Sequence, residues 1–435
     1  MHISAGDTAW MLTSTALVLF MMPGLALFYG GLVGAKNVIA TMVQSFVAIG
    51  IISLLWVIVG YSLTFGADHA GLIGGLQNAM LIGVGAKPNS YAPTIPALLY
   101  MAFQMKFAVI TPALIAGAFC ERMRFRGYLV FIALWSLIVY FPFAHAVWAA
   151  GGILGSGGLH AIDFAGGSVV HELAGAAALA TALFLRRRHQ LERPHSIPLV
   201  LLGAGILWFG WFGFNAGSAL SAGSVAASAL VNTQLGGSAA MVAWMAVEWW
   251  RRGKPTGAGI AAGAVAGLAA ITPASGFVPP WAAIIIGGAA GLLCYGAVHL
   301  KDIFHYDDSL DVVGVHMVGG LIGVVLTGVF ASLAVNAAGQ PGGLTQLGRQ
   351  AVLAIAGIAY PFVMTWVILW VTDKTVGLQV DPEQEQAGLD LTEHGEPAYG
   401  VMDASVLDIA GVTSNGGPAA SGTADGGAAG QETVS

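Results

Sequence analysis

Two short segments of the chain repeat one arrangement of an aspartate and a histidine. Residues 163–171 and 308–316 both begin with aspartate and end with histidine, with seven residues between the two. A glycine follows each histidine after three further residues, at Gly175 and Gly320. A neutral imidazole donates one hydrogen bond, accepts another and passes a proton at physiological pH. The repeated pattern therefore predicts a pair of histidines that work together on a small polar substrate or a proton.

Both histidines stand within long apolar stretches, where an ionisable side chain is costly and marks a candidate functional site. The ionisable residues inside or at the ends of such stretches are Lys106, Asp163, His171, Glu172, Glu248, Asp308, Asp311 and His316. A lone buried histidine is most often a satisfied core residue, but two at matched positions favour a functional pair. Asp163, Asp308 and Asp311 each fit a helix N-cap, where a carboxylate accepts free backbone amides. For Asp163 a second role in attracting a cation stays open.

Metal binding and catalysis are the rival uses of such histidines. His171 and Glu172 lack the second histidine four residues on that a zinc protease motif needs, and no cluster supplies a third ligand. No nucleophile elbow, Walker loop or dinucleotide fingerprint stands in a suitable context. We expect no enzyme, no cofactor and no nucleic-acid partner, and catalysis remains the weaker alternative. Cys120 and Cys294 are expected to be small core residues without a disulfide.

The elements that must position these residues are membrane-spanning helices. Of 435 residues, 57% are hydrophobic and only 9% are charged, whereas soluble proteins carry about a quarter charged residues. About 20 mostly apolar residues cross the hydrocarbon core. We predict an all-α polytopic membrane protein with eleven transmembrane helices, at residues 9–33, 39–64, 96–120, 127–147, 165–185, 198–216, 225–250, 257–274, 279–300, 311–334 and 350–372.

The positions of lysine and arginine give the orientation, because these residues gather in cytoplasmic loops. With eleven helices, thirteen of the sixteen basic residues fall on one side. They are Lys36, Arg122, Arg124, Arg126, Arg186, Arg187, Arg188, Arg193, Arg251, Arg252, Lys254, Lys301 and Lys374. The opposite loops hold only Lys87 and Arg349, and Lys106 falls inside a helix. We therefore predict an N-terminus outside and a C-terminus inside.

This topology gives the two Asp–His segments opposite directions. Residues 163–171 open the fifth helix from outside, and residues 308–316 open the tenth from inside. Eight residues of helix rise about 12 Å, so each histidine reaches the middle of the membrane. We predict a transmembrane domain of residues 1–372 with two inverted five-helix repeats, about 9–185 and 198–334, and a last helix, 350–372.

The remainder of the chain is predicted to be cytoplasmic. Eleven of the twenty-two acidic residues follow position 372, where Lys374 is the only basic residue. Residues 373–400 are polar but varied and form a candidate regulatory segment. Residues 401–435 are rich in Gly, Ala, Ser and Thr, which predicts a disordered low-complexity tail.

Four stretches resemble signatures of the Amt/Mep/Rh ammonium transporter family. They are 22–31 (MPGLALFYGG), 163–171 (DFAGGSVVH), 211–218 (WFGFNAGS) and 311–316 (DVVGVH). The resemblance covers residues of about 7 to 400, and residues 388–399 look like the Amt branch. It implies an ammonium transporter or ammonia channel of the plasma (inner) membrane that also accepts methylammonium. It further implies a homotrimer with one pore per subunit, and members of this branch can be blocked by a PII-type regulatory protein from the cytoplasm.

The resemblance carries roles over to individual residues of this chain. His171 and His316 match the twin pore histidines, and Phe107 and Phe214 match a paired aromatic gate. Phe103, Trp148 and Ser218 match the outer vestibule that first holds the cation, and Asp163 matches the acid supporting it. Thr392 resembles a tail threonine that is phosphorylated in some members. Lys106, beside Phe107, is no defining family feature, and we expect it to extend toward an interface.

Two alternatives to the transporter stay open. One is an ammonium sensor that signals through the acidic tail and conducts little, which the intact pore residues His171, His316, Phe107 and Phe214 argue against. The other is a transporter of a different small cation or amine, whose vestibule would be bulkier or more acidic than one with Asp163 alone.

Overall fold

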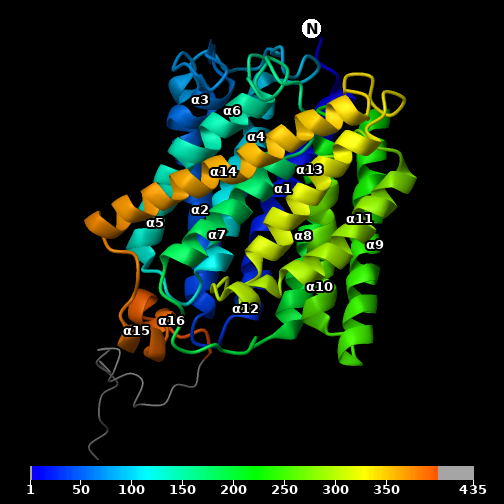
Figure 1. Cartoon of the computed structure of the whole chain (residues 1–435). Coiled ribbons are helices and arrows are strands. Elements are labelled where there is room, and N and C mark those ends of the chain that lie inside the picture. Colours follow the sequence, from blue (N-terminus) through cyan, green and yellow to red (C-terminus); the bar gives the residue numbers. More distant parts are fainter. Residues whose placement is uncertain (1, 400–435) are drawn as a thin grey trace, which may run out of the picture.

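The computed structural model describes residues 2–399, which fold into a bundle of long helices (Figure 1). The first half contains α1 (Ala5–Leu32), α2 (Val38–Leu55), α3 (Tyr61–Phe65), α4 (Ala97–Ile115), α5 (Phe125–Trp135), α6 (Phe141–Trp148) and α7 (Leu173–Phe184). The second contains α8 (Ile197–Gly217), α9 (Ser224–Arg252), α10 (Gly257–Ile271), α11 (Pro280–Ala297), α12 (Leu300–Phe304), α13 (Val318–Phe330) and α14 (Leu344–Thr375). The predicted tail, 401–435, lies outside the described residues.

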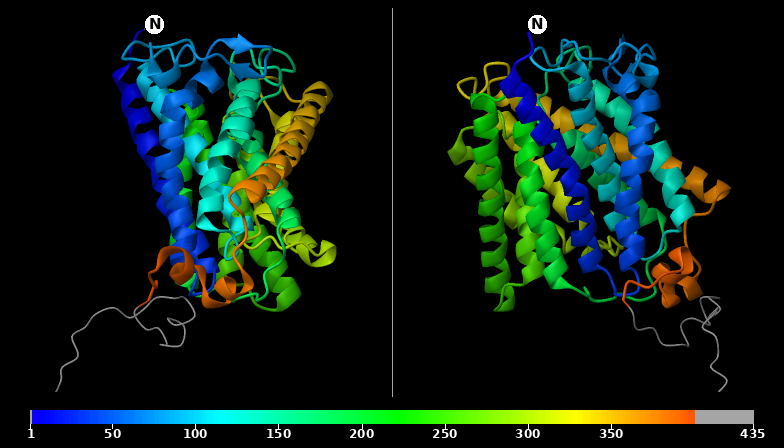
Figure 2. Two further views of the ribbon diagram at one scale, coloured as in Figure 1. Left: turned by 90° about the vertical axis from the view of Figure 1, so that its left-hand side faces the viewer. Right: turned by 180° about the vertical axis from the view of Figure 1, so that it is seen from behind.

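Short elements complete the fold. Strands β1 (Asp68–His69) and β2 (Ile73–Gly74) pair antiparallel after α3. Helices α15 (Pro382–Ala387) and α16 (Leu389–His394) end the described chain. Turns of 3₁₀ helix cover Ala79–Leu81 (η2) and Ala116–Ala118 (η3). The N-terminus and the two strands lie at one end of the bundle, and α15 and α16 lie at the other (Figure 2).

Nine helices in the described part of the chain are long and apolar enough to cross a membrane. The other two predicted spans also coincide with helices, but neither meets both conditions. Helix α9 has 29 residues and contains the polar run 232–234, and α10 has only 15 residues. The prediction of an all-α polytopic membrane protein is confirmed, and the count of eleven stays a prediction.

The helices that carry the two histidines begin in the same unusual way. A π-helical turn, η5 (Gly167–Glu172), leads into α7, and a second, η6 (Val313–Met317), leads into α13. Further π-helical turns join α2 to α3 (η1, Trp56–Gly60) and α5 to α6 (η4, Ser136–Tyr140). Such turns are rare in proteins overall, and those that occur often lie at functional sites. Their presence at both histidines supports a matched pair of half-structures.

The contacts between the two half-structures are reciprocal. Helix α7 packs against η6, while α13 packs against η5. A Cβ added at Gly175 would collide with Met317, and one added at Gly320 would lie 3.0 Å from the backbone nitrogen of Glu172. Each glycine thus meets the residue that follows the other histidine. This reciprocity is what an in-plane twofold relation produces, although the repeat boundaries stay predictions.

Two long contacts hold the bundle together around these turns. Helices α1 and α8, one from each half, pack along their length through small residues such as Gly24 and Gly203. Helix α14 runs diagonally across the outside of the bundle and packs against α7 and α13 (Figure 1). Small residues let backbones approach closely, which is the usual basis of helix association in lipid.

The end that carries α15 and α16 also gathers the basic residues assigned to the cytoplasm. Arg122 Nη1 lies 2.5 Å from Asp307 Oδ2, and Arg188 Nη2 lies 2.7 Å from Asp307 Oδ1. Burial alone would raise the pKa of Asp307, but the charges of Arg188 and Arg122 outweigh it and hold that pKa at about 2. Cys120 and Cys294 are buried and free, as expected.

Candidate functional site

The outer part of the site is a group of aromatic rings. The ring centroids of Phe103 and Phe107 are 5.0 Å apart, and those of Phe107 and Trp148 are 5.9 Å apart and nearly perpendicular. The Ser218 hydroxyl donates to the carbonyl of Phe214 at 2.9 Å, so its oxygen remains free to accept. Trp148 and Ser218 are partly exposed, whereas Phe103 is buried. The group is therefore an aromatic cup that solvent can reach.

Asp163 holds the backbone behind this cup. Its carboxylate accepts four backbone amides, from Gly166 (2.8 Å), Gly167 (2.7 Å), Ser168 (2.9 Å) and Val169 (3.1 Å). The Trp148 indole donates to the Asp163 carbonyl oxygen at 2.9 Å. The carboxylate thus caps η5, as predicted, and its backbone fixes the Trp148 ring.

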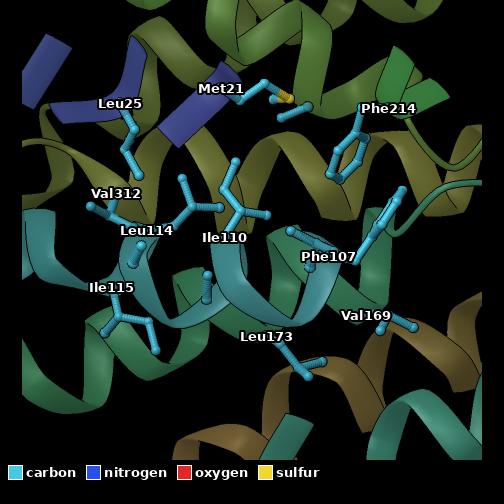
Figure 3. Close-up of a cluster of buried hydrophobic side chains, with 14 of the residues drawn as sticks. Met21, Leu25, Phe107, Ile110, Leu114, Ile115, Val169, Leu173, Phe214 and Val312 are labelled. Carbon is cyan, nitrogen blue, oxygen red and sulfur yellow. The ribbon is translucent and has the colours of Figure 1, made fainter. Parts of the chain in front are cut away.

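Below the cup, two phenylalanine rings close the passage. Phe107 from α4 and Phe214 from α8 stack with centroids 4.2 Å apart and planes at 28°. Figure 3 shows the two rings next to each other, within a cluster of buried hydrophobic side chains that includes Met21 and Leu25. Both rings are buried. In this structure, the outer cup and the histidines are therefore separated by two aromatic rings.

His171 and His316 meet behind these rings. Their Nδ1 atoms lie 3.2 Å apart, and their ring planes are 17° apart. When both rings are neutral, one Nδ1 donates and the other accepts. His171 also stacks on Trp211, and the Trp211 indole donates to Thr272 at 2.9 Å. His171 Nε2 has no partner within the described residues, so it is free to bond to a molecule in the passage.

The passage around the histidines is narrow and mostly apolar. A cavity of about 10 Å³ reaches both imidazoles, which is room for about one water-sized molecule. It is lined by Met21, Leu25, Phe28, Tyr29, Ile110, Leu114, Val170, His171, Leu207, Trp211, Phe214, Val265 and His316. The lining is thus mainly aliphatic and aromatic carbon, with the two imidazoles as its nitrogen-containing hydrogen-bonding groups beside the Tyr29 hydroxyl and the Trp211 indole.

On the cytoplasmic side the passage widens to a cavity of about 260 Å³ that His316 also lines. Asp308 accepts the amide of Val313 at 2.7 Å and so caps η6. Burial, together with the charge of Asp311, raises the pKa of Asp308 to about 7. The prediction that Asp311 is a cap is wrong: its carboxylate lies 2.5 Å from Lys301 Nζ, and its own backbone is left-handed (φ 62°).

The structure brings most of the predicted residues into one path. Ring contacts connect Phe103, Phe107, Trp148, Phe214, His171 and His316 in one series, and Asp163 and Ser218 adjoin it through hydrogen bonds to Trp148 and Phe214. Thr392 lies apart, on α16, where its hydroxyl donates to the Gly388 carbonyl at 2.9 Å. Lys106 is partly buried, and its Nζ lies 3.8 Å from Met105 Sδ.

Trp211, which the sequence pattern did not single out, lines the narrow cavity and stacks on His171. It precedes Phe214 by three residues on α8, and residues three apart share a helix face. That spacing could have placed it beside the gate. The indole covers one face of the His171 ring, so it fixes the ring plane and excludes water from that side.

Together, fold and site define a multi-pass membrane protein with a narrow apolar passage that contains two adjacent imidazoles. A family model described as the Ammonium Transporter Family matches residues 9–399. The chain belongs to this family.

Relatives and solved structures agree with this assignment. An ammonium transporter of Aquifex aeolicus is 50% identical, over 91% of this chain and 94% of its own length. An ammonium transporter of Bacillus subtilis is 47% identical, over 91% of this chain and 98% of its own length. The crystal structure of Saccharomyces cerevisiae Mep2 matches with a TM-score of 0.83 at 36% identity, over 87% of this chain and 88% of that one. A structure described as a sensor Amt protein also has a TM-score of 0.83, at 29% identity, over 89% of this chain and 98% of that one.

Proposed function

We propose that this protein transports ammonium by taking it up at the outer aromatic cup, removing a proton and conducting ammonia past the twin histidines. The observation that carries this proposal is the position of the His171–His316 pair, inside an apolar passage beyond two stacked aromatic rings. A passage of this kind rejects ions and accepts a small neutral molecule that hydrogen-bonds to imidazole. Membership of the ammonium transporter family supports the choice of ammonia as that molecule.

Recognition of ammonium takes place at the cup. The faces of Trp148, Phe103 and Phe107 attract a cation, and a partly desolvated cation–π contact contributes about 1–2 kcal/mol. Ser218 accepts one hydrogen bond from ammonium through the oxygen that its own hydrogen bond leaves free. Potassium is attracted by the same rings but has no hydrogen to donate, so the cup concentrates cations and discriminates weakly.

Selection takes place at the phenylalanine gate and beyond it. Carrying an intact cation through an apolar passage costs several kcal/mol, and neutral ammonia passes far more cheaply. Ammonium can leave its proton behind, whereas potassium cannot. Methylammonium can do the same and is the expected analogue substrate.

The histidines bind ammonia and offer a path for the proton. Burial disfavours a charged imidazolium, so the working state is a pair of neutral rings joined through Nδ1. A neutral pair can pass a proton from one ring to the other while ammonia crosses beside it. Transport is then electrogenic if the proton follows the ammonia inward, and electroneutral if the proton returns outside.

Assembly and regulation complete the proposal. A homotrimer with one pore per subunit follows the family. Segment 376–396 lies against the cytoplasmic loops, where Asp390 accepts the amide of Ala40 at 2.8 Å and Glu393 accepts the amide of Phe125 at 2.8 Å. This docked segment is the proposed regulatory surface, with Thr392 as a phosphorylation site and a PII-type protein as a partner from the cytoplasm.

The second candidate is an ammonium sensor that conducts little. The similarity to a solved sensor Amt protein and the docked tail favour it. Transport is tested by purified protein in liposomes that contain a pH-sensitive dye, with ammonium or potassium added outside. The proposal expects a protein-dependent change of internal pH with ammonium and none with potassium. No difference from empty liposomes, for a correctly assembled protein, would favour the sensor.

A further inference from the structure

One buried acid lies beside the pore without a role in the mechanism above. Glu172 follows His171 directly and is fully buried within a membrane-spanning helix. Both of its carboxylate oxygens lack a hydrogen-bond partner, and none of the ion pairs within residues 2–399 includes it. An unpaired carboxylate in a hydrocarbon environment is strongly disfavoured, so the side chain rests as the neutral acid.

The surroundings of Glu172 provide a second polar group. The Ser168 hydroxyl, one turn earlier, is also fully buried and without a partner. A Cβ added at Gly357 of α14 would collide with both Ser168 Oγ and Glu172 Oε2. The two oxygens therefore flank one point on α14, and only a glycine leaves room for them. A protonated Glu172 can donate to Ser168 across this space.

Ser168 links this acid to the outer end of the pore. Its backbone amide donates to Asp163 Oδ2 at 2.9 Å, and Asp163 stands directly behind Trp148. Asp163, Ser168 and Glu172 thus form a row of polar groups along η5. Neither Ser168 nor Glu172 lines the narrow cavity that reaches the histidines. Glu172 nevertheless has the depth of His171, since neighbouring residues differ by only about 1.5 Å along a helix.

The inner half of the molecule has no such row. The positions that correspond to Ser168 and Glu172, counted from His316, hold Val313 and Met317. The reciprocal packing of Gly175 and Gly320 matches the two backbones at this point. Ser168 and Glu172 differ from Val313 and Met317 in facing Gly357 of α14, a helix outside the two predicted repeats.

We infer that Glu172 is a proton-binding residue of the transport cycle, in a polar row Asp163–Ser168–Glu172 that runs beside the ammonia passage. This inference rests on the proposed transport of ammonium. It names Glu172 as the group that binds the proton that ammonium releases. Ammonium divides into ammonia and a proton at the outer cup. The protonated Glu172 gives its proton to water on the cytoplasmic side, and the proton released by ammonium replaces it, so one proton enters and one leaves per cycle. The carboxyl group of Glu172 is therefore protonated again at the end of each cycle.

The test compares Glu172→Gln with Glu172→Asp, with Thr181→Val, at another fully buried polar residue of α7, as the control. Glutamine keeps the size and hydrogen bonding of the acid but cannot release a proton, while aspartate can. We expect the ammonium-evoked current in liposomes to fall at least tenfold in Glu172→Gln, to return in part in Glu172→Asp, and to stay unchanged in Thr181→Val. Infrared spectra should show a protonated-carboxyl band near neutral pH that Glu172→Gln alone removes.

The outcomes separate this inference from the proposed function. Equal currents in the wild type and Glu172→Gln overturn the role of Glu172 and leave ammonium transport in place. A wild type that changes internal pH without a current overturns it as well, because no proton then crosses. A wild type with neither signal contradicts the proposed function itself. Variants that fail to assemble are recognised by gel filtration. The carboxyl band of Asp308→Asn, a variant in which Asp308 no longer contributes to it, then decides whether Glu172 is protonated: its absence overturns the inference.

Discussion

His171 Nδ1 lies 3.2 Å from His316 Nδ1, although 145 residues separate the two in the chain. The contact joins the two halves of the molecule at their centre, through the two π-helical turns η5 and η6. Each imidazole uses Nδ1 for the other, and His171 Nε2 has no partner in the described part of the chain. Under the proposed function, this nitrogen is the one that ammonia would meet.

Trp148 is expected to set the affinity for ammonium. Replacing it with leucine removes a cation–π contact of about 1–2 kcal/mol, so the half-saturating ammonium concentration should rise about 5- to 30-fold. The gate and the histidines stay in place, and the maximal rate should change little. Uptake measured over a range of ammonium concentrations tests this, with Trp281→Leu, at a tryptophan exposed on the surface of the subunit, as control. An unchanged half-saturating concentration in Trp148→Leu would show that the cup does not bind the cation.

We expect the main role of Asp163 to be structural. Asp163→Ala leaves four buried amides without an acceptor, and each such loss costs about 1–3 kcal/mol. The midpoint temperature of thermal unfolding should fall far more in Asp163→Ala than in Asp163→Asn, because asparagine keeps one acceptor oxygen. The exposed Asp373→Ala is the matched control and should match the wild type. A stable Asp163→Ala protein would contradict the capping role.

Asp307 should make the cytoplasmic end sensitive to acid. The pKa of Asp307 in the folded protein, about 2, lies below its ordinary value of 3.8. Its contribution to stability is therefore complete above about pH 4 and is lost as the pH falls from there toward 2. Thermal unfolding followed between pH 5 and pH 2 should show this loss in the wild type.

The variant Asp307→Asn should lack this pH dependence and should be less stable throughout. It leaves the buried Arg122 without its ion pair, at a cost of about 3–5 kcal/mol. Asp381→Asn breaks an exposed pair with Arg124 and should cost less than about 1 kcal/mol. Equal losses in the two variants would show that burial does not matter to this network.

Thr392 offers a test of the docked tail. An aspartate at this position cannot donate to the Gly388 carbonyl and adds a charge between Asp390 and Glu393, both of which accept backbone amides. Repulsion from the new charge should release Asp390 or Glu393 from the backbone amide that it caps, at a cost of about 1 kcal/mol. Proteolysis of segment 376–396 should therefore become about fivefold faster in Thr392→Asp. Thr392→Val removes the hydrogen bond without adding charge and should change it less. An equal rate in Thr392→Asp and the wild type would argue against a phosphorylation switch.

Much of this site could be predicted from local patterns. The matched spacing from Asp163 to His171 and from Asp308 to His316 predicted a pair of histidines, and the two imidazoles do meet. Their depth in the membrane stays a prediction, because η5 and η6 begin only at Gly167 and Val313 and the helix rise counted from the aspartates does not apply. Asp163 and Asp308 were correctly assigned as caps. The all-α polytopic class followed from composition alone, whereas helices α9 and α10 are too polar or too short to confirm the count of spans.

Other features depend on tertiary contacts that no local pattern reveals. The π-helical turns at both histidines pack against helices of the opposite half, and no local pattern predicted them. Asp311 has a left-handed backbone and pairs with Lys301, ten residues earlier, so its cap-like sequence position was misleading. Trp211 became a pore residue only when α8 was placed against His171.

The measurement that tests the central claim most directly is ammonium-evoked current together with internal pH, in liposomes that hold the wild type or the His171→Ala, His316→Ala double variant. His189→Ala, at an exposed histidine far from the pore, is the control. The proposal predicts that wild type and control respond to ammonium and ignore potassium. In the double variant, the ammonium response should be lost or a potassium current should appear. A double variant with the wild-type response and selectivity would contradict the role of the two histidines as filter and relay.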